Sequence, residues 1–513
     1  MKTSVKVQFF GDVCFNKLPE NQINKVLADV CDKVSNADLR IINLECPITE
    51  NKEETAIEKT GEHWNATVAI IDFIKALNVD IVTLANNHVG DYGTEGVRNT
   101  ICKLNAASKK YIGAGENIDE AYNAFYYDGN GIRVSFIAVC EKEFGVASKK
   151  TAGSAGFSIR NIFNKIKEEK KRSDHVVVIM HGGNEGNPLP SPEQVERYRF
   201  LIDVGASVVV GMHTHCPQGY ELYNKGIILY SLGNFFFPYY ERFNNSYAAW
   251  YTGYIAELLI SESGIEVNTI PYQYSFAEEK IKICDAKSTA SFKRYLEKLN
   301  KIVADEEELK RYYAAWTLHI GKKYADRVYW CKEFSDERKQ KQCLEIQNLF
   351  RCEAHREMMQ NYFEILSQKK EQEYEEYWTK LKELFFIPLE MHDWKEEMDA
   401  IYEYVNLVKQ AELLEFVARD GKNFICGAGK CGITIYKKLR DNNYKVERFY
   451  DNNEQKEGTF ICDTPIEMYG RLISCHEKLS KYIIAVIEKK NQEKIVQQLL
   501  ALGVQKEQIF IGG

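Results

Sequence analysis

Short apolar runs rich in β-branched residues alternate with amphipathic stretches along the first half of the chain. The runs are nearly continuous, as expected of strands buried on both faces of a sheet. They fall at residues 5–10, 39–45, 79–85, 133–139, 175–181, 206–212 and 226–233. Stretches with helical spacing lie between them, for example at 65–77 and 193–205. The alternation predicts a layered α/β domain over residues 1–275, finished by an alternating strand at 252–261.

The composition changes over residues 276–418. Gly and Pro become rare, and apolar residues recur at three- and four-residue spacing in SFKRYLEKLNKIVA, EELKRYYAAWTLHI and EEYWTKLKELFF. This spacing predicts a helical domain or linker. Its charge-dense stretch SDERKQKQCLEIQ is interpreted as a solvated helix face. The helices could form a lid, a spacer or the interface of a homo-oligomer, and the pattern does not choose among them.

Residues 419–513 return to α/β alternation. The stretch KNFICGAGKCG reads as a strand and a Gly-rich turn, and it is followed by a helix and a second strand, KVERFYDNN. A third strand, a helix and a short last strand complete the pattern. We expect a small Rossmann-like α/β domain here. The pattern shows only one βαβ unit clearly.

The bulk composition narrows the classes of protein. The 513 residues contain 45% hydrophobic and 27% charged residues and have a net charge of −7, which is typical of a soluble globular protein and argues against nucleic acid as a partner. The 14 cysteines form no CxxC pair, so we expect reduced thiols. No stretch approaches the roughly 20 apolar residues of a membrane span, and MKTSVKVQFFGDV has no signal-peptide h-region. We therefore expect a cytoplasmic protein without a membrane span.

Acids, amides and histidines collect where the predicted strands of the first domain end. They are Asp12 in GDV, Glu45 in NLE, Asn87, His88 and Asp91 in ANNHVGD, His181 in HGGNE, and His213 and His215 in HTH. The carboxyl ends of strands present functional groups to a cleft, and imidazoles with carboxylates are ligands of divalent transition metals. Each residue alone is more often a turn former or a structural histidine, so the hypothesis depends on the ordered set. Strand alternation would place His213 and His215 on one face.

These motifs carry a resemblance. GDV (11–13), NLECPIT (43–49), LANNHVGDYG (84–93), HGGNE (181–185), GMHTHCPQG (211–219) and LYSLGNFFF (229–237) together resemble the bacterial capsule-synthesis family, best known from poly-γ-glutamate capsules. That family lies within the calcineurin-like metallophosphoesterase superfamily. The resemblance covers residues 1 to about 260 and implies a four-layer α/β sandwich with a two-metal site. Many relatives carry an N-terminal membrane anchor, and we expect none in this chain.

The resemblance also implies roles for individual residues. The first ion would be bound by Asp12, Glu45 and His215, and the second by Glu45, Asn87, His181 and His213, with Glu45 as the bridge. His88 would be the general acid or a contact to the transition state, with Asp91 beside it in the catalytic set. Asn43, Asp91 and Glu185 would orient the ligands from outside. The ions would be Mn, Fe or Zn.

Two positions depart from the superfamily pattern. Its first motif is Asp-x-His, whereas Cys14 stands two places after Asp12. Its second motif is GD, whereas NLE is found here, which leaves the bridge at Glu45 open. The resemblance therefore leaves two alternatives, a pair of ions or a single ion.

The Gly-rich turn of the last domain is a second candidate site. Gly427, Gly429 and Gly432 form GxGxxG between a strand and a helix, and Asp451 closes the next strand 19 residues after Gly432. Helix N-terminal amides could receive a pyrophosphate while the acid takes a ribose hydroxyl. This region resembles nucleotide-binding modules attached to sugar-modifying enzymes of bacterial surface-glycan pathways. The alternative is a docking domain that binds no nucleotide.

Our leading hypothesis is a metal-dependent hydrolase acting on a phosphoester, or on a related acyl or amide bond, in envelope-polymer biosynthesis. Its partner would be an envelope-polymer precursor or another phosphoester substrate. The alternative is a non-catalytic scaffold or regulator of capsule assembly. In that reading, the last domain would sense a nucleotide or nucleotide-sugar.

Overall fold

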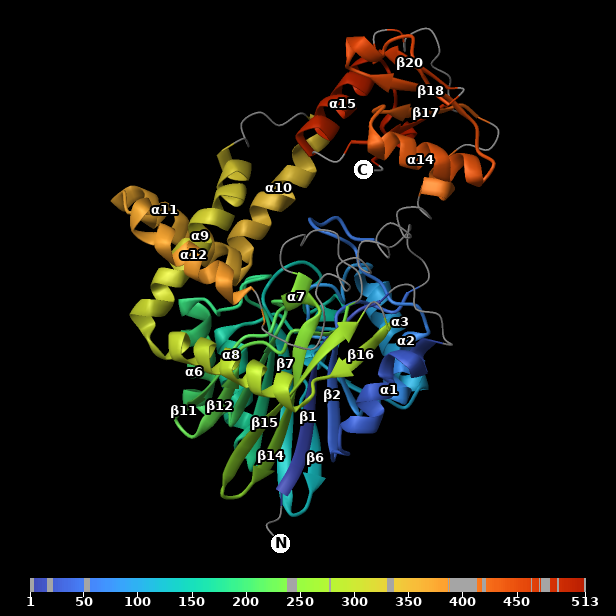
Figure 1. Cartoon of the computed structure of the whole chain (residues 1–513). Helices are drawn as coiled ribbons and strands as arrows, with labels where there is room; N and C mark the ends of the chain where they lie inside the picture. The colour runs from blue at the N-terminus through green and yellow to red at the C-terminus, as the bar shows by residue number, and fades with distance from the viewer. Residues whose placement is uncertain are drawn as a thin grey trace. The chain divides into compact units, whose positions relative to one another are not determined.

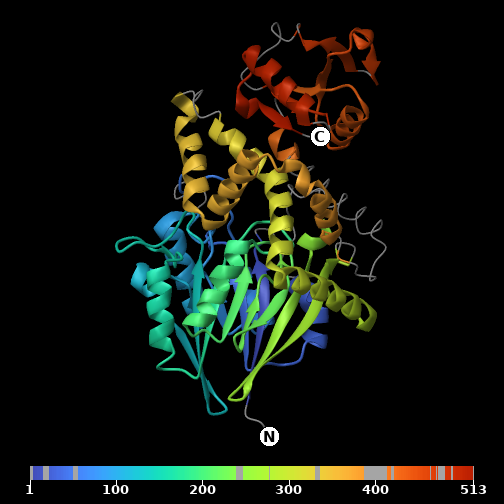
Figure 2. The same cartoon turned by 90° about the vertical axis from the view of Figure 1, so that its left-hand side faces the viewer.

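The computed structural model describes residues 4–15, 22–49, 56–237, 247–275, 278–329, 336–385, 387, 413–417, 421–462, 464–469, 471, 480–486 and 489–511. The chain divides into two units, Met1–Asp393 and Trp394–Gly513, which are taken separately below (Figures 1 and 2). The boundary predicted near residue 418 lies outside the described residues. The division into three parts stays a prediction.

Two β-sheets form the N-terminal part of the first unit. The first sheet has the order β16-β15-β14-β1-β2-β3-β4, with β13 also paired to β1. Its strands are β1 (Ser4–Val13), β2 (Leu39–Leu44), β3 (Ile81–Thr83), β4 (Lys110–Ile112), β13 (Asn234–Phe236), β14 (Thr252–Ser261), β15 (Gly264–Ser275) and β16 (Lys280–Ile283). Strands β1 to β4 run parallel, and β14, β15 and β16 add an antiparallel meander. The prediction that 252–261 finishes the domain is wrong, because two further strands follow it.

The second sheet has the order β11-β12-β10-β9-β7-β6. Its strands are β6 (Phe125–Gly129), β7 (Ile132–Cys140), β9 (His175–His181), β10 (Val208–Met212), β11 (Tyr220–Tyr223) and β12 (Gly226–Leu229). The four central strands are parallel, and the two edges are antiparallel. A small separate ladder joins β5 (Ala114–Gly115) to β8 (Gly153–Ser154).

The two sheets pack against each other, and helices cover them on the outside. Phe9 of β1 and Phe136 of β7 meet across the sheets with ring centroids 6.4 Å apart, inside one continuous apolar core. Helices α1 (Ile23–Lys33), α2 (Ile70–Ala76) and α3 (Gly93–Ala106) lie beside the first sheet, and α5 (Ile159–Glu169) and α6 (Pro192–Val204) beside the second (Figure 1). This is the predicted four-layer sandwich. It explains why the strand runs are apolar on both faces. Short helices α4 (Ile118–Ala121) and α7 (Tyr247–Trp250) lie in the connections.

A helical segment follows β16 within the same unit. Its elements are α8 (Ala286–Ala304), α9 (Glu306–Tyr329), α10 (Asp336–Arg351), α11 (Glu353–Gln368), the 3₁₀ turn Glu371–Tyr374 and α12 (Glu375–Leu384). Helix α11 is bonded to the sandwich at its first turn, where the N–H of Ala354 donates to Glu141 and Glu353 accepts from the N–H of Lys142 at 2.9 Å. Glu141 in turn donates its N–H to the carbonyl of His181 at 2.9 Å. The helical segment is thus fixed to the sheet edge where β9 ends.

The second unit is a parallel sheet with the order β20-β18-β17-β21-β22, edged by β19. Its elements are β17 (Asn423–Cys426), α14 (Lys430–Asp441), β18 (Val446–Asp451), the 3₁₀ turn Glu454–Lys456, β19 (Phe460–Ile461), β20 (Thr464–Met468), β21 (Lys481–Ile484), α15 (Lys489–Ala501), the 3₁₀ turn Lys506–Gln508 and β22 (Ile509–Ile511). The order extends in both directions from β17, so the unit contains more than the one βαβ unit that the sequence pattern made clear. No helix among the described residues is long and apolar enough to span a bilayer.

Candidate metal centre

The strand pairing brings the predicted ligands to one edge of the sandwich. Parallel pairing sets Asp12 of β1 opposite Asn43 of β2, and Met212 of β10 opposite His181 of β9. Glu45 therefore follows β2 beside Asp12, and His213 follows β10 beside His181. Because parallel strands end together, residues from four separate motifs share one site.

A close approach of two backbones fixes Asp12. The N–H of Asp12 donates to the carbonyl of Gly233 at 3.2 Å. A Cβ on Gly11 would lie 1.8 Å from that carbonyl oxygen, so only glycine fits before Asp12. The GD motif is therefore explained by the contact between β1 and the turn before β13.

Among the described residues, three groups of side chains could hold a metal ion. Within each group the ligand atoms lie within 4.8 Å of one another. The groups are Asp12, Glu45 and His215; Glu45, His181 and His213; and Glu185, His213 and His215. The first two groups match the sets implied for the first and second ion, and they share Glu45. Asn87 joins the second group, since its Oδ1 lies 3.0 Å from Nε2 of His181. The third group brings in Glu185, which was expected only as an orienting residue.

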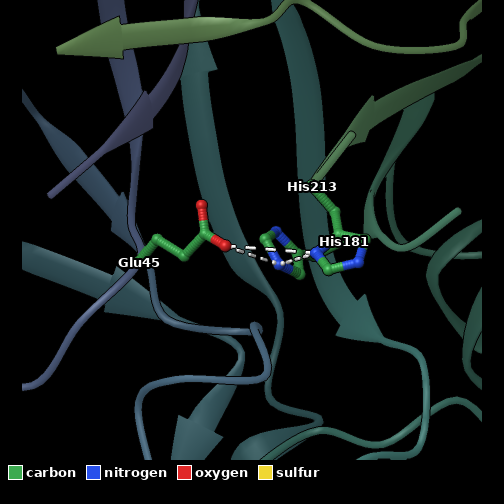
Figure 3. A group of neighbouring side chains, drawn as sticks. All are labelled: Glu45, His181 and His213. Atoms are coloured by element: carbon green, nitrogen blue, oxygen red, sulfur yellow. Dashed lines mark hydrogen bonds and ion pairs between the residues drawn. The ribbon is translucent and has the colours of Figure 1, made fainter. Parts of the chain in front are cut away.

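The carboxylate of Glu45 is the most unusual group in this cluster. It is fully buried, and neither of its oxygens has a hydrogen-bond partner among the described residues. Its Oε1 lies 3.4 Å from Nε2 of His181 and 4.0 Å from Nδ1 of His213 (Figure 3). The same atom lies 3.6 Å from Nε2 of His215. A buried charge without compensation is strongly unfavourable. A cation among these atoms would remove that penalty, so the donor set fits a divalent metal.

The electrostatics of the protein chain alone agree with this reading. Burial raises the pKa of Asp12 to about 7, and raises that of Glu45 well above its ordinary value with a further contribution from Asp12. Burial lowers the pKa of His215 to about 3, and lowers those of His181 and His213 well below the ordinary value. The close histidine–carboxylate contacts are therefore not ion pairs. The imidazoles are neutral, which is the form that binds metal ions.

Hydrogen bonds from outside the cluster orient several of these side chains. Asn43 donates from Nδ2 to Asp12 at 2.7 Å, and the same atom lies 3.2 Å from Nδ1 of His181. The N–H of His213 donates to Asp12 at 3.0 Å. Nδ1 of His215 lies 2.9 Å from Oδ1 of Asn234. Partners of this kind fix the ring orientation of ligand histidines.

The two histidines of HTH are brought to the site by a turn and not by strand alternation. Strand β10 ends at Met212, and the φ angles of His213 and His215 are +95° and +56°. The prediction that alternation puts both rings on one face is wrong. Non-glycine residues with positive φ cost roughly 1–3 kcal/mol each when the conformation is a sparsely populated one. Such conformations collect at functional sites, where the surrounding structure enforces them.

His88 lies beside this cluster and is held by its own pair of residues. Its Nδ1 lies 2.8 Å from Oδ2 of Asp91 and 3.2 Å from Nζ of Lys59, and Lys59 also forms an ion pair with Asp91. Burial, followed by the charge of Lys59, lowers the pKa of His88 despite the opposing effect of Asp91. Asp91 thus anchors Nδ1 of a neutral imidazole, and Nε2 is the ring nitrogen that does not face Asp91.

Two residues of this region were not assigned a role from the sequence. Lys59 lies in a loop of charged residues whose pattern carries no signal of a buried position, yet its side chain is only 4% exposed. Asn234 lies in the quoted LYSLGNFFF motif, so its position after a strand-like run was a usable signal. Cys14 is buried beside Cys46 and belongs to none of the three described ligand groups.

The Gly-rich turn of the second unit has the geometry expected of GxGxxG. Gly427 has φ +117°, a Cβ on Gly432 would lie 2.0 Å from the Gly427 carbonyl oxygen, and Gly429 faces open space. The positive φ marks a tight turn at Gly427, and the short contact marks close packing of the helix at Gly432. Asp451 accepts from the N–H of Ala428 at 2.8 Å and from Lys456 at 3.0 Å.

A two-sheet sandwich with carboxylates and imidazoles at the strand ends is an arrangement consistent with the calcineurin-like metallophosphoesterases. Residues 6–239 match the family described as Bacterial capsule synthesis protein PGA_cap. These residues, just under half of the chain, are therefore similar to this family.

Individual proteins are similar to part of this chain. The capsule biosynthesis protein CapA of Bacillus anthracis is 32% identical over 239 residues, which are 44% of this chain and 58% of that protein. The PGA biosynthesis protein CapA of Bacillus subtilis is 33% identical over 199 residues, 38% of this chain and 52% of that protein. The chain thus covers just over half the length of these relatives. A hypothetical protein from Thermus thermophilus has a TM-score of 0.34 and 17% identity, covering 52% of this chain and 99% of its own.

Proposed function

We propose that the first unit is a metal-dependent hydrolase that acts in the biosynthesis of a capsule, of poly-γ-glutamate or of another cell-envelope polymer. The observation that carries the proposal is the buried Glu45 carboxylate, which has no hydrogen-bond partner in the described part of the chain and faces three neutral imidazoles. The names of the two Bacillus relatives support the biological setting. The bond to be hydrolysed would be a phosphoester, or a related acyl or amide bond.

The candidate ligands would bind two ions, each of them Mn, Fe or Zn. Asp12, Glu45 and His215 would hold one ion, and Glu45, Asn87, His181 and His213 would hold the other. Bound ions of this kind polarise a substrate oxygen and lower the pKa of a water molecule. Asn43 holds Asp12 in position, and Asn234 holds His215.

His88 would donate a proton to the leaving group. Asp91 accepts from Nδ1 of His88, and Lys59 holds Asp91 in place. This fixes the ring of the neutral imidazole with its lone pair at Nε2. A proton that Nε2 takes up from the attacking water could then be delivered to a departing oxygen or nitrogen. The low pKa of His88 in the free protein favours release of that proton once it has been taken up.

The test is turnover by the purified full chain after reconstitution with Mn²⁺ or Zn²⁺. A chromogenic phosphodiester and a γ-glutamyl anilide would distinguish phosphoester from amide chemistry. We expect hydrolysis of one of them, and its loss in the His213→Ala/His215→Ala variant. Metal binding without hydrolysis of either substrate class would favour the alternative function, a scaffold in capsule assembly.

A second function is favoured for the last unit, namely sensing of a nucleotide or nucleotide-sugar. The supporting observation is the open space at Gly429 next to the point where the strand order reverses, between β17 and β21. Calorimetry of the full chain with NAD, UDP-sugars and ATP tests this function. Absence of heat with all three would leave a docking role for this unit.

A further inference from the structure

Glu185 lies close to the candidate metal centre but comes from none of the strand ends that hold it. It lies in the loop between β9 and α6, and it is exposed where His213 and His215 are buried. Its carboxylate and the ligand nitrogens of those two histidines lie within 4.8 Å of one another. The carboxylate therefore approaches both ion positions from the exposed side.

The first ion position is short of one ligand in this chain. Its group among the described residues contains Asp12, Glu45 and His215. Cys14, two places after Asp12, is buried beside Cys46 and belongs to none of the three described ligand groups. Asp12, Glu45 and His215 alone would leave this ion with three protein ligands.

Charge also favours a third carboxylate. Two divalent ions bring four positive charges, whereas Asp12 and Glu45 together bring two negative ones and the imidazoles are neutral. Glu185 would add a third negative charge beside His213 and His215, on the exposed side of the cluster.

We propose that Glu185 is a direct ligand of the metal centre and, from its place beside His213 and His215, supplies the first ion with a fourth protein ligand. The proposal rests on the metal-dependent function proposed above. It changes the role expected of Glu185 from orienting other ligands to binding the ion itself.

The test is titration of the chelator-stripped full chain with Mn²⁺, followed by electron paramagnetic resonance of the free ion. We expect two equivalents in the native protein. In Glu185→Gln, one equivalent should bind as before and the other at least about tenfold more weakly, since even residues outside the ligand shell contribute 10- to 100-fold. Glu143→Gln is the matched control, because Glu143 is a neighbouring acid that accepts from Asn348 at 3.2 Å and belongs to none of the described ligand groups. It should bind like the native protein.

Visible absorption of the Co²⁺-saturated proteins distinguishes ligation from a long-range effect of charge. Loss of a ligand changes the d–d bands, so Glu185→Gln should differ from the native protein and Glu143→Gln should not. Equal Mn²⁺ affinity in Glu185→Gln, or weaker binding with an unchanged Co²⁺ spectrum, would overturn the proposal and leave the metal-dependent function standing. A native protein that binds no Mn²⁺ at all would overturn both.

Discussion

Nε2 of His181 lies 3.0 Å from Nδ1 of His213, although His181 ends β9 and His213 follows β10. Burial keeps both rings neutral, and these two ring nitrogens lie together beside the Glu45 carboxylate. This convergence is what the metal proposal predicts, and it identifies the pair of residues whose removal should matter most.

The combined His181→Ala and His213→Ala variant should lose at least about a hundredfold in affinity for one ion, because it removes two ligands from one position. Metal content by plasma mass spectrometry measures this loss, and hydrolysis of the substrate found above should fall with it. His175→Ala is the control, since His175 lies at the other end of β9 and contacts Ser207 and the carbonyl of Ser261. Full metal content in the double variant would refute this ligand assignment.

Replacement of His88 by Asn should reduce kcat by about 10²- to 10⁴-fold while the metal content stays unchanged, as expected for loss of a general acid. The reduction should be much smaller for a substrate with a 4-nitrophenol leaving group, which departs without a proton. A comparison of kcat for good and poor leaving groups measures the effect. His63→Ala serves as the control, because the contacts of His63 among the described residues are the carbonyl of Ile57 and the ring of Tyr92. An equal loss for both leaving groups would argue against proton donation.

Glu357 should make the stability of the first unit depend on pH. It lies on α11, accepts from Ser191 and from the N–H of Glu193, and has a pKa that burial raises from 4.5 to about 7. Because the folded protein binds this proton more tightly than the unfolded one, the stabilisation is complete below about pH 4.5. It is lost as the pH rises through about 7, with an upper limit of about 3 kcal/mol.

Thermal unfolding between pH 5 and pH 8.5 measures this dependence. The melting temperature should fall with rising pH in the native protein and fall less in Glu357→Gln. Glu364→Gln, on an exposed position of the same helix, should behave like the native protein. A slope unchanged by Glu357→Gln would mean that other buried acids, such as Glu141, govern the dependence.

The glycines of the second unit should tolerate a methyl group very differently. In Gly432→Ala the new Cβ would lie 2.0 Å from the Gly427 carbonyl oxygen, whereas in Gly429→Ala it would meet no atom within 4 Å. Gly432→Ala should therefore destabilise this unit by roughly 1–3 kcal/mol, as other overpacking changes do. Gly429→Ala should leave its stability nearly unchanged. Denaturant unfolding of the full chain, followed by a probe in the second unit, measures both, and equal stabilities would contradict the packing role of Gly432.

The amino-acid sequence by itself determined the layered α/β class, because buried strands need continuous apolar runs and surface helices need one apolar face. It also determined most of the candidate ligands, since the end of a predicted strand marks a place at the sheet edge. Asp12, Glu45 and His181 were found in this way without any knowledge of which strands pair.

Only the tertiary structure decided the rest. The partners of each ligand depend on strand order and on contacts between residues far apart in the sequence, as with Lys59 and Asp91 or Asn234 and His215. The turn at His213 and His215 departs from strand geometry because the surrounding packing enforces positive φ angles, which no local pattern encodes. The position of Glu185 beside both histidines has the same origin, because a loop side chain is placed by the fold around it and not by its neighbours in the chain.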